Sequence, residues 1–501
     1  MPKAERAVFR IAIFSRLLLL ALIIVWRSLF PPYDSSARLN PSCLSSSSTA
    51  GDSTPLAAAA GHRVLWPWVG AAIEGSVVWD GVYFVRIAEC GYEYEQTYAF
   101  QPLLPLCIAF LTRSVLAPLV PVIGYRAVLA LSGYLLNNVA FVLAVVYFYR
   151  LSVLILKDST TSLQAVTLFC FNPASVFYSS IYSESLYALS SLGGIFYLFS
   201  GYQTLAMILL AISGAARSNG AINAGYFCFK ALLQTYDAII QKKGNKLVVW
   251  AVSAGVARAI CVFVPFAAFQ AYGYHNLCVH DSSNDLRPWC KSRIPDLYSY
   301  VQSHYWGIGF LRYFQVKQLP NFLLAFPILS IAVASIIRYA TLIPQTLHPL
   351  NVATRNTDSM LHAVGHNQNR VISSDSWLSS QETGTDTIQR RKNENSASSR
   401  KFDDLNLELD AFFKLKQGYC SILVLPFILH LIFMTFMVFF VMHVQVATRF
   451  LSASPPIYWF ASYVTLSPGT TSRRAGYVIW CYFIAYILVG SLLFSNFYPF
   501  T

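Results

Sequence analysis

The sequence is a succession of long apolar runs separated by shorter polar stretches. One helical crossing of a bilayer takes about 20 apolar residues, and several runs reach that length. A transmembrane β-barrel would instead alternate apolar and polar positions over short strands. We therefore predict an all-α, polytopic integral membrane protein. It would have about ten transmembrane helices, near residues 9–30, 103–123, 126–148, 163–180, 184–201, 204–227, 247–272, 319–343, 415–441 and 476–497.

The first apolar run follows a basic N-terminus that carries Lys3 and Arg6. We predict a retained signal anchor over residues 1–30, with its basic end in the cytosol, because cytosolic flanks are enriched in Lys and Arg. A cleaved signal peptide is the alternative. The long apolar part and the lack of a small-residue cleavage site directly after it favour the anchor.

Counting crossings from this anchor divides the chain into alternating regions. They are a first lumenal loop at 31–102, transmembrane helices over 103–272, an aromatic-rich lumenal loop at 273–318, a helix at 319–345, a polar cytosolic loop at 346–414, and C-terminal helices over 415–501 with a small lumenal loop at 443–460. The Ser-rich stretch 31–62 predicts a linker, and the composition of 346–414 is typical of disorder. Arg150 and Lys157 fit the count less well, so a count that differs by two spans stays open.

The charge of the chain adds little to this picture. Only 12% of the residues are charged, against about 25% in soluble domains. The net charge is +13, which we assign to cytosolic loops and membrane borders and not to nucleic-acid binding. A basic funnel for an anionic lipid is also compatible with it.

The ten cysteines include no Cys-x-x-Cys pair. Cys278 and Cys290 share one polar loop, and an oxidising lumen would favour a disulfide between them. Free thiols are the equal alternative. A zinc pair is not favoured, because no further ligands stand at metal spacing, so we predict no metal site.

Residues 77–105 are the candidate reactive stretch. A helical pattern places Asp80, Phe84 and Ile87 on one face, and the adjacent Trp79 suits the headgroup level of a membrane. Asp80 would then present a carboxylate at the interface, either as a general base or as a helix cap. Glu89 points the opposite way on a continuous helix, and a structural pair with Arg86 is the expectation that the spacing favours.

Other charged residues lie in or next to apolar runs. Arg217 is a functional hypothesis because a charge inside the membrane is costly. It would bind a lipid phosphate beside the hydrogen-bonding Asn219, or it would pair with Glu184 within the membrane. Glu184 would otherwise mark the water interface.

A further candidate group, His443, Gln445 and Arg449, follows a predicted span. Arg449 would bind phosphate bidentately, or it would be a border arginine. The chain has no glycine-rich phosphate loop after a strand, so a transferred sugar would come from a lipid-linked donor.

These residues stand in motifs that resemble the GPI mannosyltransferase 2 family (PIG-V type). The first motif comprises Trp79-Asp80, Phe84, Ile87-Ala88-Glu89, Gly91-Tyr92, Tyr94-Glu95, Ala99-Phe100, Pro102 and Pro105. The later ones are Asn172-Pro173, Tyr182-Ser183-Glu184, Arg217-Ser218-Asn219-Gly220, Pro288-Trp289-Cys290, Tyr298-Ser299-Tyr300, Tyr305-Trp306, Lys317-Gln318, residues 320–325, residues 443–451 and Asn496-Phe497. The resemblance extends from about residue 77 to the C-terminus, apart from 346–414.

The resemblance implies an endoplasmic reticulum membrane enzyme with the GT-C fold and a catalytic first lumenal loop. Such an enzyme transfers the second mannose, in α1,6 linkage, from dolichyl-phosphate mannose to a mannosylated glucosaminyl-phosphatidylinositol acceptor. Asp80 would be the catalytic base of an inverting transfer, with no cofactor. The leaving phosphate needs cations, for which Arg217, Arg449 and His443 are candidates. The other expected substrate-binding residues are Trp79, Glu89, Glu184, Asn219 and Gln445.

Some points depart from this family or stay open. Tyr83 and Gln101 stand where some members have His and Phe, so a required histidine one turn from Asp80 is in doubt here. A small membrane accessory subunit stays an open partner. The alternatives are another dolichyl-phosphate-mannose-dependent transferase, an inactive scaffold, and a polytopic lipid or solute transporter, although no inverted repeat is evident.

Overall fold

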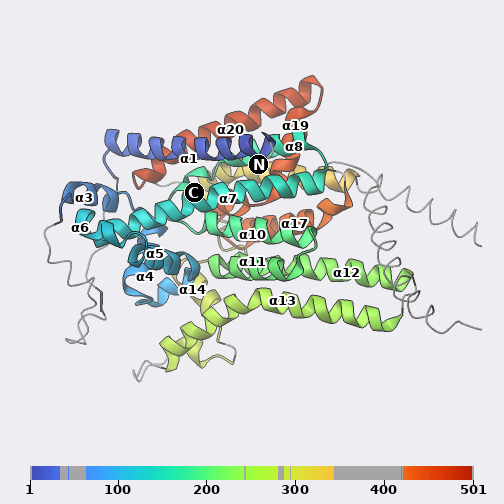
Figure 1. Ribbon diagram of the computed structural model, residues 1–501, viewed down its shortest axis with the longest axis horizontal. Helices are drawn as coiled ribbons and strands as arrows, with labels where there is room; N and C mark the ends of the chain where they lie inside the picture. The colour runs from blue at the N-terminus through green and yellow to red at the C-terminus, as the bar shows by residue number, and fades with distance from the viewer. Residues whose placement is uncertain are drawn as a thin grey trace, which may run out of the picture.

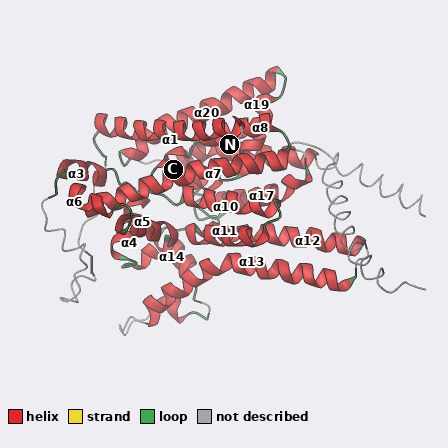
Figure 2. Ribbon diagram, viewed as in Figure 1, coloured by secondary structure: helices red, strands yellow, loops and turns green. Residues whose placement is uncertain are grey.

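The computed structural model describes residues 3–33, 43–44, 64–241, 244–279, 287–293, 295–342, 419 and 421–498. All regular structure in these ranges is helical (Figure 2). Six of the described helices are long and apolar enough to cross a membrane: α1 (Lys3–Leu29), α7 (Tyr125–Leu156), Asn245–Val279, which begins with α13 (Asn245–Tyr274), Val316–Leu342, Ile422–Phe440, which contains α17 (Leu425–Phe440), and α20 (Thr470–Ser495). This confirms the predicted all-helical, polytopic class.

Other predicted spans are short or interrupted in the structure. Leu103–Arg113 (α5) and Ala117–Ile123, which contains η4 (Ala117–Leu119) and α6 (Val120–Ile123), are bent by 68° and make a seventh span if counted together. The 163–180 region contains α8 (Ser159–Cys170) and α9 (Ser175–Ser179). They are separated at Asn172 and Pro173, where proline supplies no backbone N–H. α10 (Glu184–Phe199) has 16 residues. The count of ten spans therefore stays a prediction.

The predicted span 204–227 differs from the structure at the charged residue. α11 (Gln203–Ala216) ends directly before Arg217, whose backbone is extended, and η5 (Ser218–Asn223) leads into α12 (Ala224–Ile240). The chain turns closely here, since a Cβ on Gly220 would lie 2.1 Å from the Ser213 carbonyl oxygen. The break places Arg217 at an end of a helix and not within one.

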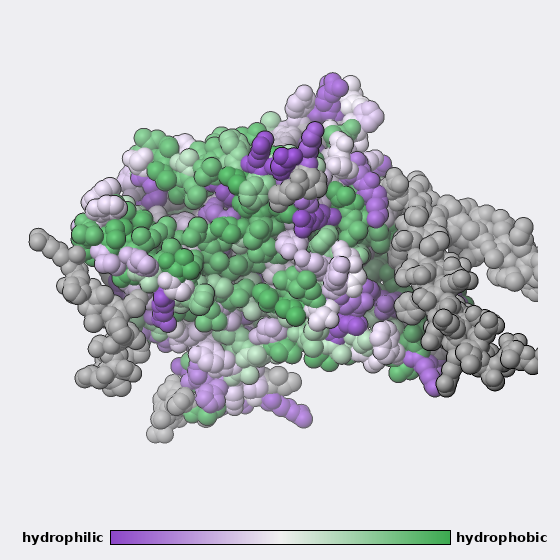
Figure 3. Space-filling view, viewed as in Figure 1, coloured by the Kyte–Doolittle hydropathy of each residue, from purple (hydrophilic) through white to green (hydrophobic). Residues whose placement is uncertain are grey.

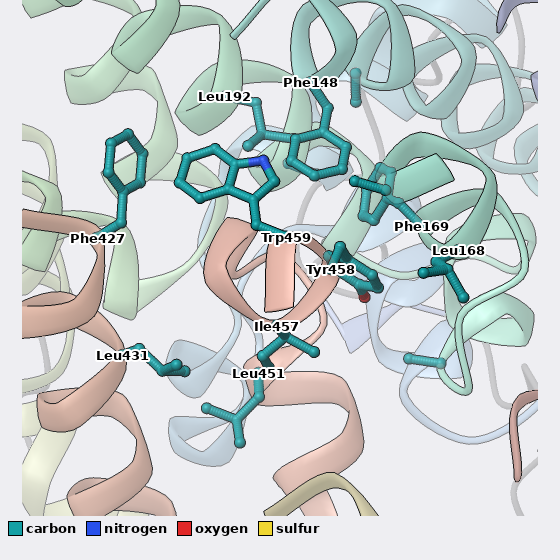
Figure 4. Close-up of a cluster of buried hydrophobic side chains, with 14 of the residues drawn as sticks. Phe148, Leu168, Phe169, Leu192, Phe427, Leu431, Leu451, Ile457, Tyr458 and Trp459 are labelled. Atoms are coloured by element: carbon teal, nitrogen blue, oxygen red, sulfur yellow. The ribbon is translucent and has the colours of Figure 1, made fainter. Parts of the chain in front are cut away.

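The segment 443–460, which is predicted as a small loop between two spans, is partly helical in the structure. The segment contains η11 (Val444–Val446), α18 (Ala447–Leu451) and the start of α19 (Pro455–Leu466). The two prolines that begin α19 are compatible with a helix, because proline is well suited to the first helical turn. Trp459 is fully buried between Phe148 and Phe427 (Figure 4), with ring centroids 6.5 and 4.9 Å away. Its indole N–H donates to the Ser152 hydroxyl at 2.8 Å, so this segment belongs to the core.

Several short elements lie together at one end of the long helices. α3 (Pro67–Gly75), α4 (Asp80–Cys90), α5 and α14 (Leu297–Tyr305) lie there, at the left of Figure 1. Figure 3 shows a broad hydrophobic area over the middle of the visible face, with hydrophilic residues toward its ends. This distribution suits a bundle that spans a bilayer. The 346–414 loop and most of the 31–62 linker lie outside the described residues.

Two disulfides are found at the same end. Cys278 is bonded to Cys290, the pair suggested by the sequence, and Cys43 is bonded to Cys90 at the end of α4. The second bond ties the region before the first motif to the helix that starts with Asp80.

Arg16 of α1 holds the break between α8 and α9. It is 2% exposed and donates to the Cys170 carbonyl at 3.0 Å, the Ser175 carbonyl at 3.0 Å and the Ser179 hydroxyl at 2.9 Å. Its guanidinium also lies 3.8 Å from the centroid of the Phe141 ring. One planar cation therefore satisfies carbonyls freed at the end of α8.

We predict that Arg16→Lys destabilises the protein by about 1–3 kcal/mol, because an ammonium does not reproduce the fork of donors and leaves a buried carbonyl unpaired. Unfolding of the detergent-solubilised protein measures the change. Arg10→Lys is the matched control, since Arg10 is an exposed arginine of the same helix. Equal stability of the two variants would contradict the proposed role of Arg16.

Candidate active site

A cavity of about 350 Å³ lies among the short elements at this end. α4, α14, η5 and the segment around α18 contribute to its wall. The predicted site residues that line it are Trp79, Asp80, Arg217, Asn219, His443, Gln445 and Arg449. Residues far apart in the sequence thus meet around one space.

Four charged side chains form a continuous network at this cavity. Arg449 contacts Asp80 through Nη1 and Oδ2 at 3.1 Å and Glu184 through Nε and Oε1 at 2.9 Å. Arg217 Nη1 lies 2.5 Å from the same Glu184 oxygen. The Glu184 side chain is 1% exposed, whereas that of Asp80 is 35% exposed. The buried acid anchors both arginines, and the more open acid faces the cavity.

Aromatic rings fix the position of Arg449. Its guanidinium carbon lies 4.6 Å from the centroid of Tyr182 and 4.8 Å from that of Phe177. The Tyr182 hydroxyl accepts a hydrogen bond from the Asp80 backbone N–H at 3.1 Å. Tyr182 therefore contacts both members of the Arg449–Asp80 pair, and cation–π contacts strengthen when they are removed from water.

Trp79 sets the direction of α4. Its backbone has φ 53°, a conformation that costs a non-glycine residue about 1–3 kcal/mol and occurs often at functional sites. The indole N–H donates to the Phe494 carbonyl at 3.2 Å, and the ring lies 5.8 Å from that of Phe497. These contacts hold the turn that makes Asp80 the first residue of α4, where a carboxylate favours the positive end of the helix dipole.

Glu95 binds the aromatic-rich loop 273–318 to the segment that follows α4. Its carboxylate accepts from the Trp289 indole at 2.6 Å and from the Tyr305 hydroxyl at 2.8 Å. Burial, together with the Glu95 carboxylate, raises the pKa of Tyr305 to about 12, so the phenol stays a donor at neutral pH. These bonds hold α14, which presents Tyr298 to the cavity.

His443 and Gln445 are held by Tyr313. The imidazole stacks on the Tyr313 ring at 4.5 Å, and the Gln445 oxygen accepts from the Tyr313 hydroxyl at 3.1 Å. Burial lowers the pKa of His443 below its ordinary value of 6.5. The imidazole is therefore neutral at neutral pH, so His443 is a poorer source of positive charge than the two arginines.

Glu89 lies outside the cavity lining. It pairs with Arg126 at 2.9 Å, and Arg86 pairs with Glu93 at 2.7 Å. The expected Arg86–Glu89 pair is replaced, because Gly91 at φ 78° turns the chain and brings Glu93 back toward α4.

Metal-ligand atoms come together once in the described residues, at Cys43, Cys90 and Glu93. The two sulfurs are bonded to each other and are not thiolates that would bind a metal. Asp80 and Glu184 are already paired with arginines. Asp80 lines the cavity and Glu184 lies buried behind it, so these two described carboxylates form an ion-pair network.

We predict that Glu184→Gln lowers the stability of the protein by about 3–5 kcal/mol, because it removes the buried anion that compensates two arginines. Denaturant unfolding in detergent measures the change. Glu5→Gln is the control, since Glu5 is 13% exposed and its Arg150 partner 39% exposed, so this pair is closer to water than Glu184 and contributes less. Similar losses in both variants would contradict the anchoring role of Glu184.

Comparison with known proteins relates the whole chain to one family. The family model described as "Mannosyltransferase (PIG-V)" matches residues 4–501. GPI alpha-1,6-mannosyltransferase 2 of Homo sapiens is 29% identical over 490 residues, which cover 86% of this chain and 89% of that protein. The Mus musculus protein of the same name is 28% identical and covers 99% of both chains. GPI mannosyltransferase 2 of Drosophila melanogaster is 28% identical over 87% of this chain and 90% of its own length.

No solved structure matches the chain, so the assignment rests on sequence. The matched region includes the four residues of the charged network as well as the aromatic loop. The chain belongs to the PIG-V family of mannosyltransferases.

Proposed function

We propose that this mannosyltransferase transfers the second mannose of the glycosylphosphatidylinositol anchor, in α1,6 linkage, from dolichyl-phosphate mannose to the mannosylated lipid precursor in the endoplasmic reticulum. The names of the relatives and their coverage of nearly the whole chain support the product. The observation that carries the mechanism is the contact of Asp80 with Arg449 at the cavity. It joins a carboxylate suited to proton transfer and a cation suited to phosphate.

Asp80 serves as the general base. Arg449 occupies Oδ2, whereas no hydrogen bond to Oδ1 is found among the described residues. Oδ1 takes the proton of the acceptor hydroxyl while the hydroxyl oxygen bonds to C1 of the donor mannose. The bond from C1 to the phosphate oxygen breaks in the same displacement. One base and one displacement invert the configuration at C1.

Arg449 and Arg217 stabilise the phosphate that leaves. The leaving group gains one negative charge as its bond to C1 breaks, and Asp80 loses one as it takes the proton. Arg449 touches Asp80, so neutralisation of Asp80 frees this cation for the phosphate. Arg217 stays within the network through Glu184. The positive charge is thus already in place where negative charge develops.

The surroundings of the cavity suit a lipid-linked reaction in an oxidising compartment. The cavity lies at the end of a bundle whose long helices are apolar enough to span a bilayer. The two disulfides lie on segments at that end, and disulfides persist in the endoplasmic reticulum lumen. We therefore propose that the cavity opens toward the lumen.

We predict that Asp80→Asn abolishes function, because an amide does not accept the acceptor proton. The test is complementation of cells that lack the second GPI mannosyltransferase, with surface GPI-anchored protein and the accumulated lipid as readouts. Loss of one base lowers the rate by about 10²–10⁴-fold, so the precursor with one mannose should accumulate.

Asp158→Asn is the matched control. Asp158 caps α8 through the backbone N–H groups of Thr160 and Thr161, a role that Asn also fills. Rescue by Asp80→Asn at matched expression would remove Asp80 from the mechanism. A stably expressed wild type that gives no rescue would argue instead for a different acceptor lipid or for transport.

A further inference from the structure

Two side-chain amides in the cavity wall have no hydrogen-bond partner. Gln101, between η3 (Glu95–Ala99) and α5, is 3% exposed, and Asn219, in η5, is 5% exposed. Both line the cavity. Within the described ranges, neither the nitrogen nor the oxygen of either amide makes a hydrogen bond. Buried polar groups are nearly always satisfied, so each of these amides requires an explanation.

Other buried amides of the bundle differ from this pair. Asn137 and Asn223 also have an unpaired oxygen, but their amide nitrogens donate to the Ser180 carbonyl and to the Ser191 and Ser213 hydroxyls. Those side chains hold segments of the fold together. The Gln101 and Asn219 side chains make no hydrogen bond to another described segment, and an apolar residue of the same shape would serve the fold as well or better.

The chemistry of an amide restricts what satisfies it. Its NH₂ group donates and its oxygen accepts. A phosphate without a proton only accepts hydrogen bonds, and it would leave the oxygens of Gln101 and Asn219 unpaired. A sugar hydroxyl both donates and accepts, so neighbouring hydroxyls of one ring match both ends of an amide. A hydroxylated ligand therefore matches these amides better than a phosphate does.

We propose that Gln101 and Asn219 bind the hydroxyl groups of a sugar ring in this cavity, an inference that rests on the function proposed above. The ring belongs either to the donor mannose or to the terminal sugar of the acceptor, which offer the same chemistry. Arg449 and Arg217 then serve the phosphate and the two amides serve the sugar.

The neighbours of Gln101 suit a sugar as well. Phe100 and Trp306 also line the cavity, and their rings meet edge to face with centroids 6.3 Å apart. Amphipathic aromatic surfaces of this kind accept the C–H face of a ring while polar groups bind its edge. This division of the cavity assigns Gln101 to the sugar and the two arginines to the phosphate.

The first test compares stability with activity. Gln101→Met removes both polar atoms and keeps the approximate length of the side chain, and Gln164→Met is the control, because Gln164 lies in α8 and is not among the cavity-lining residues. We expect Gln101→Met to keep a Tm at or above that of the wild type while kcat/KM falls about tenfold or more. Asn219→Leu should behave alike. A lower Tm with unchanged kcat/KM per folded molecule would overturn the proposal.

The second test locates the ring. Purified wild type and Gln101→Met are assayed with short-chain lipid-phosphate mannose donors, and separately with acceptors, that each lack one hydroxyl. In the wild type, loss of a bound hydroxyl should lower kcat/KM about tenfold or more. In Gln101→Met, loss of that same hydroxyl should have little further effect, since its partner is already gone.

The set of analogues, donors or acceptors, in which removal of a hydroxyl no longer lowers kcat/KM in Gln101→Met identifies the sugar ring that Gln101 binds. Non-additivity among the donors assigns Gln101 to the donor mannose, and non-additivity among the acceptors assigns it to the acceptor sugar. Full additivity in both series would overturn the inference and leave the proposed function intact. A wild type that transfers no mannose from the complete donor would overturn the proposed function and the inference with it.

Discussion

The cavity depends on the electrostatic compensation of Glu184. A carboxylate that is 1% exposed carries a large desolvation cost unless cations approach it closely. Arg217 and Arg449 supply those cations from two distant parts of the chain. Arg449 also contacts Asp80. The need of buried Glu184 for a nearby cation therefore places Arg449 where it also positions Asp80, the acid that faces the cavity.

Breaks in the helices make this arrangement attainable. Asp80 follows the strained turn at Trp79, Arg217 stands in an extended link, and Arg449 lies in the short helix α18. Irregular backbone within a membrane protein is tolerated where protein or a cavity surrounds it. Arg16 shows the same principle at the α8–α9 break, where side-chain donors satisfy freed carbonyls. Because the helices are interrupted at these points, the polar side chains can meet at one cavity. Continuous membrane-spanning helices would keep them apart.

The sequence predicted the helical class and all four members of the charged network as candidate site residues, because apolar runs and isolated charges are local signals. The Arg217–Glu184 pair was one of two alternatives for Arg217, and the structure contains it. The contacts of Arg449 with Glu184 and Asp80 were not predicted, since no spacing rule connects these positions. α19 was missed because its prolines resemble a loop when their burial is unknown. The disulfide of Cys43 was not predicted, because this cysteine lies in a Ser-rich stretch far from Cys90 in the sequence. The interest of Gln101 lies in its missing hydrogen-bond partner, which only the three-dimensional structure reveals.

The order of the network along the chain has a consequence for synthesis. The ribosome delivers Asp80, Glu184, Arg217 and finally Arg449. Glu184 and Arg217 are both in place once α11 has emerged, so the nascent chain neutralises its most deeply buried acid early. Asp80 has no Arg449 beside it until α18 is made. A chain that stops before α18 contains five of the six described long apolar helices but lacks Arg449 and its contact with Asp80. Synthesis of most of the apolar bundle and completion of the charged network are therefore separate events.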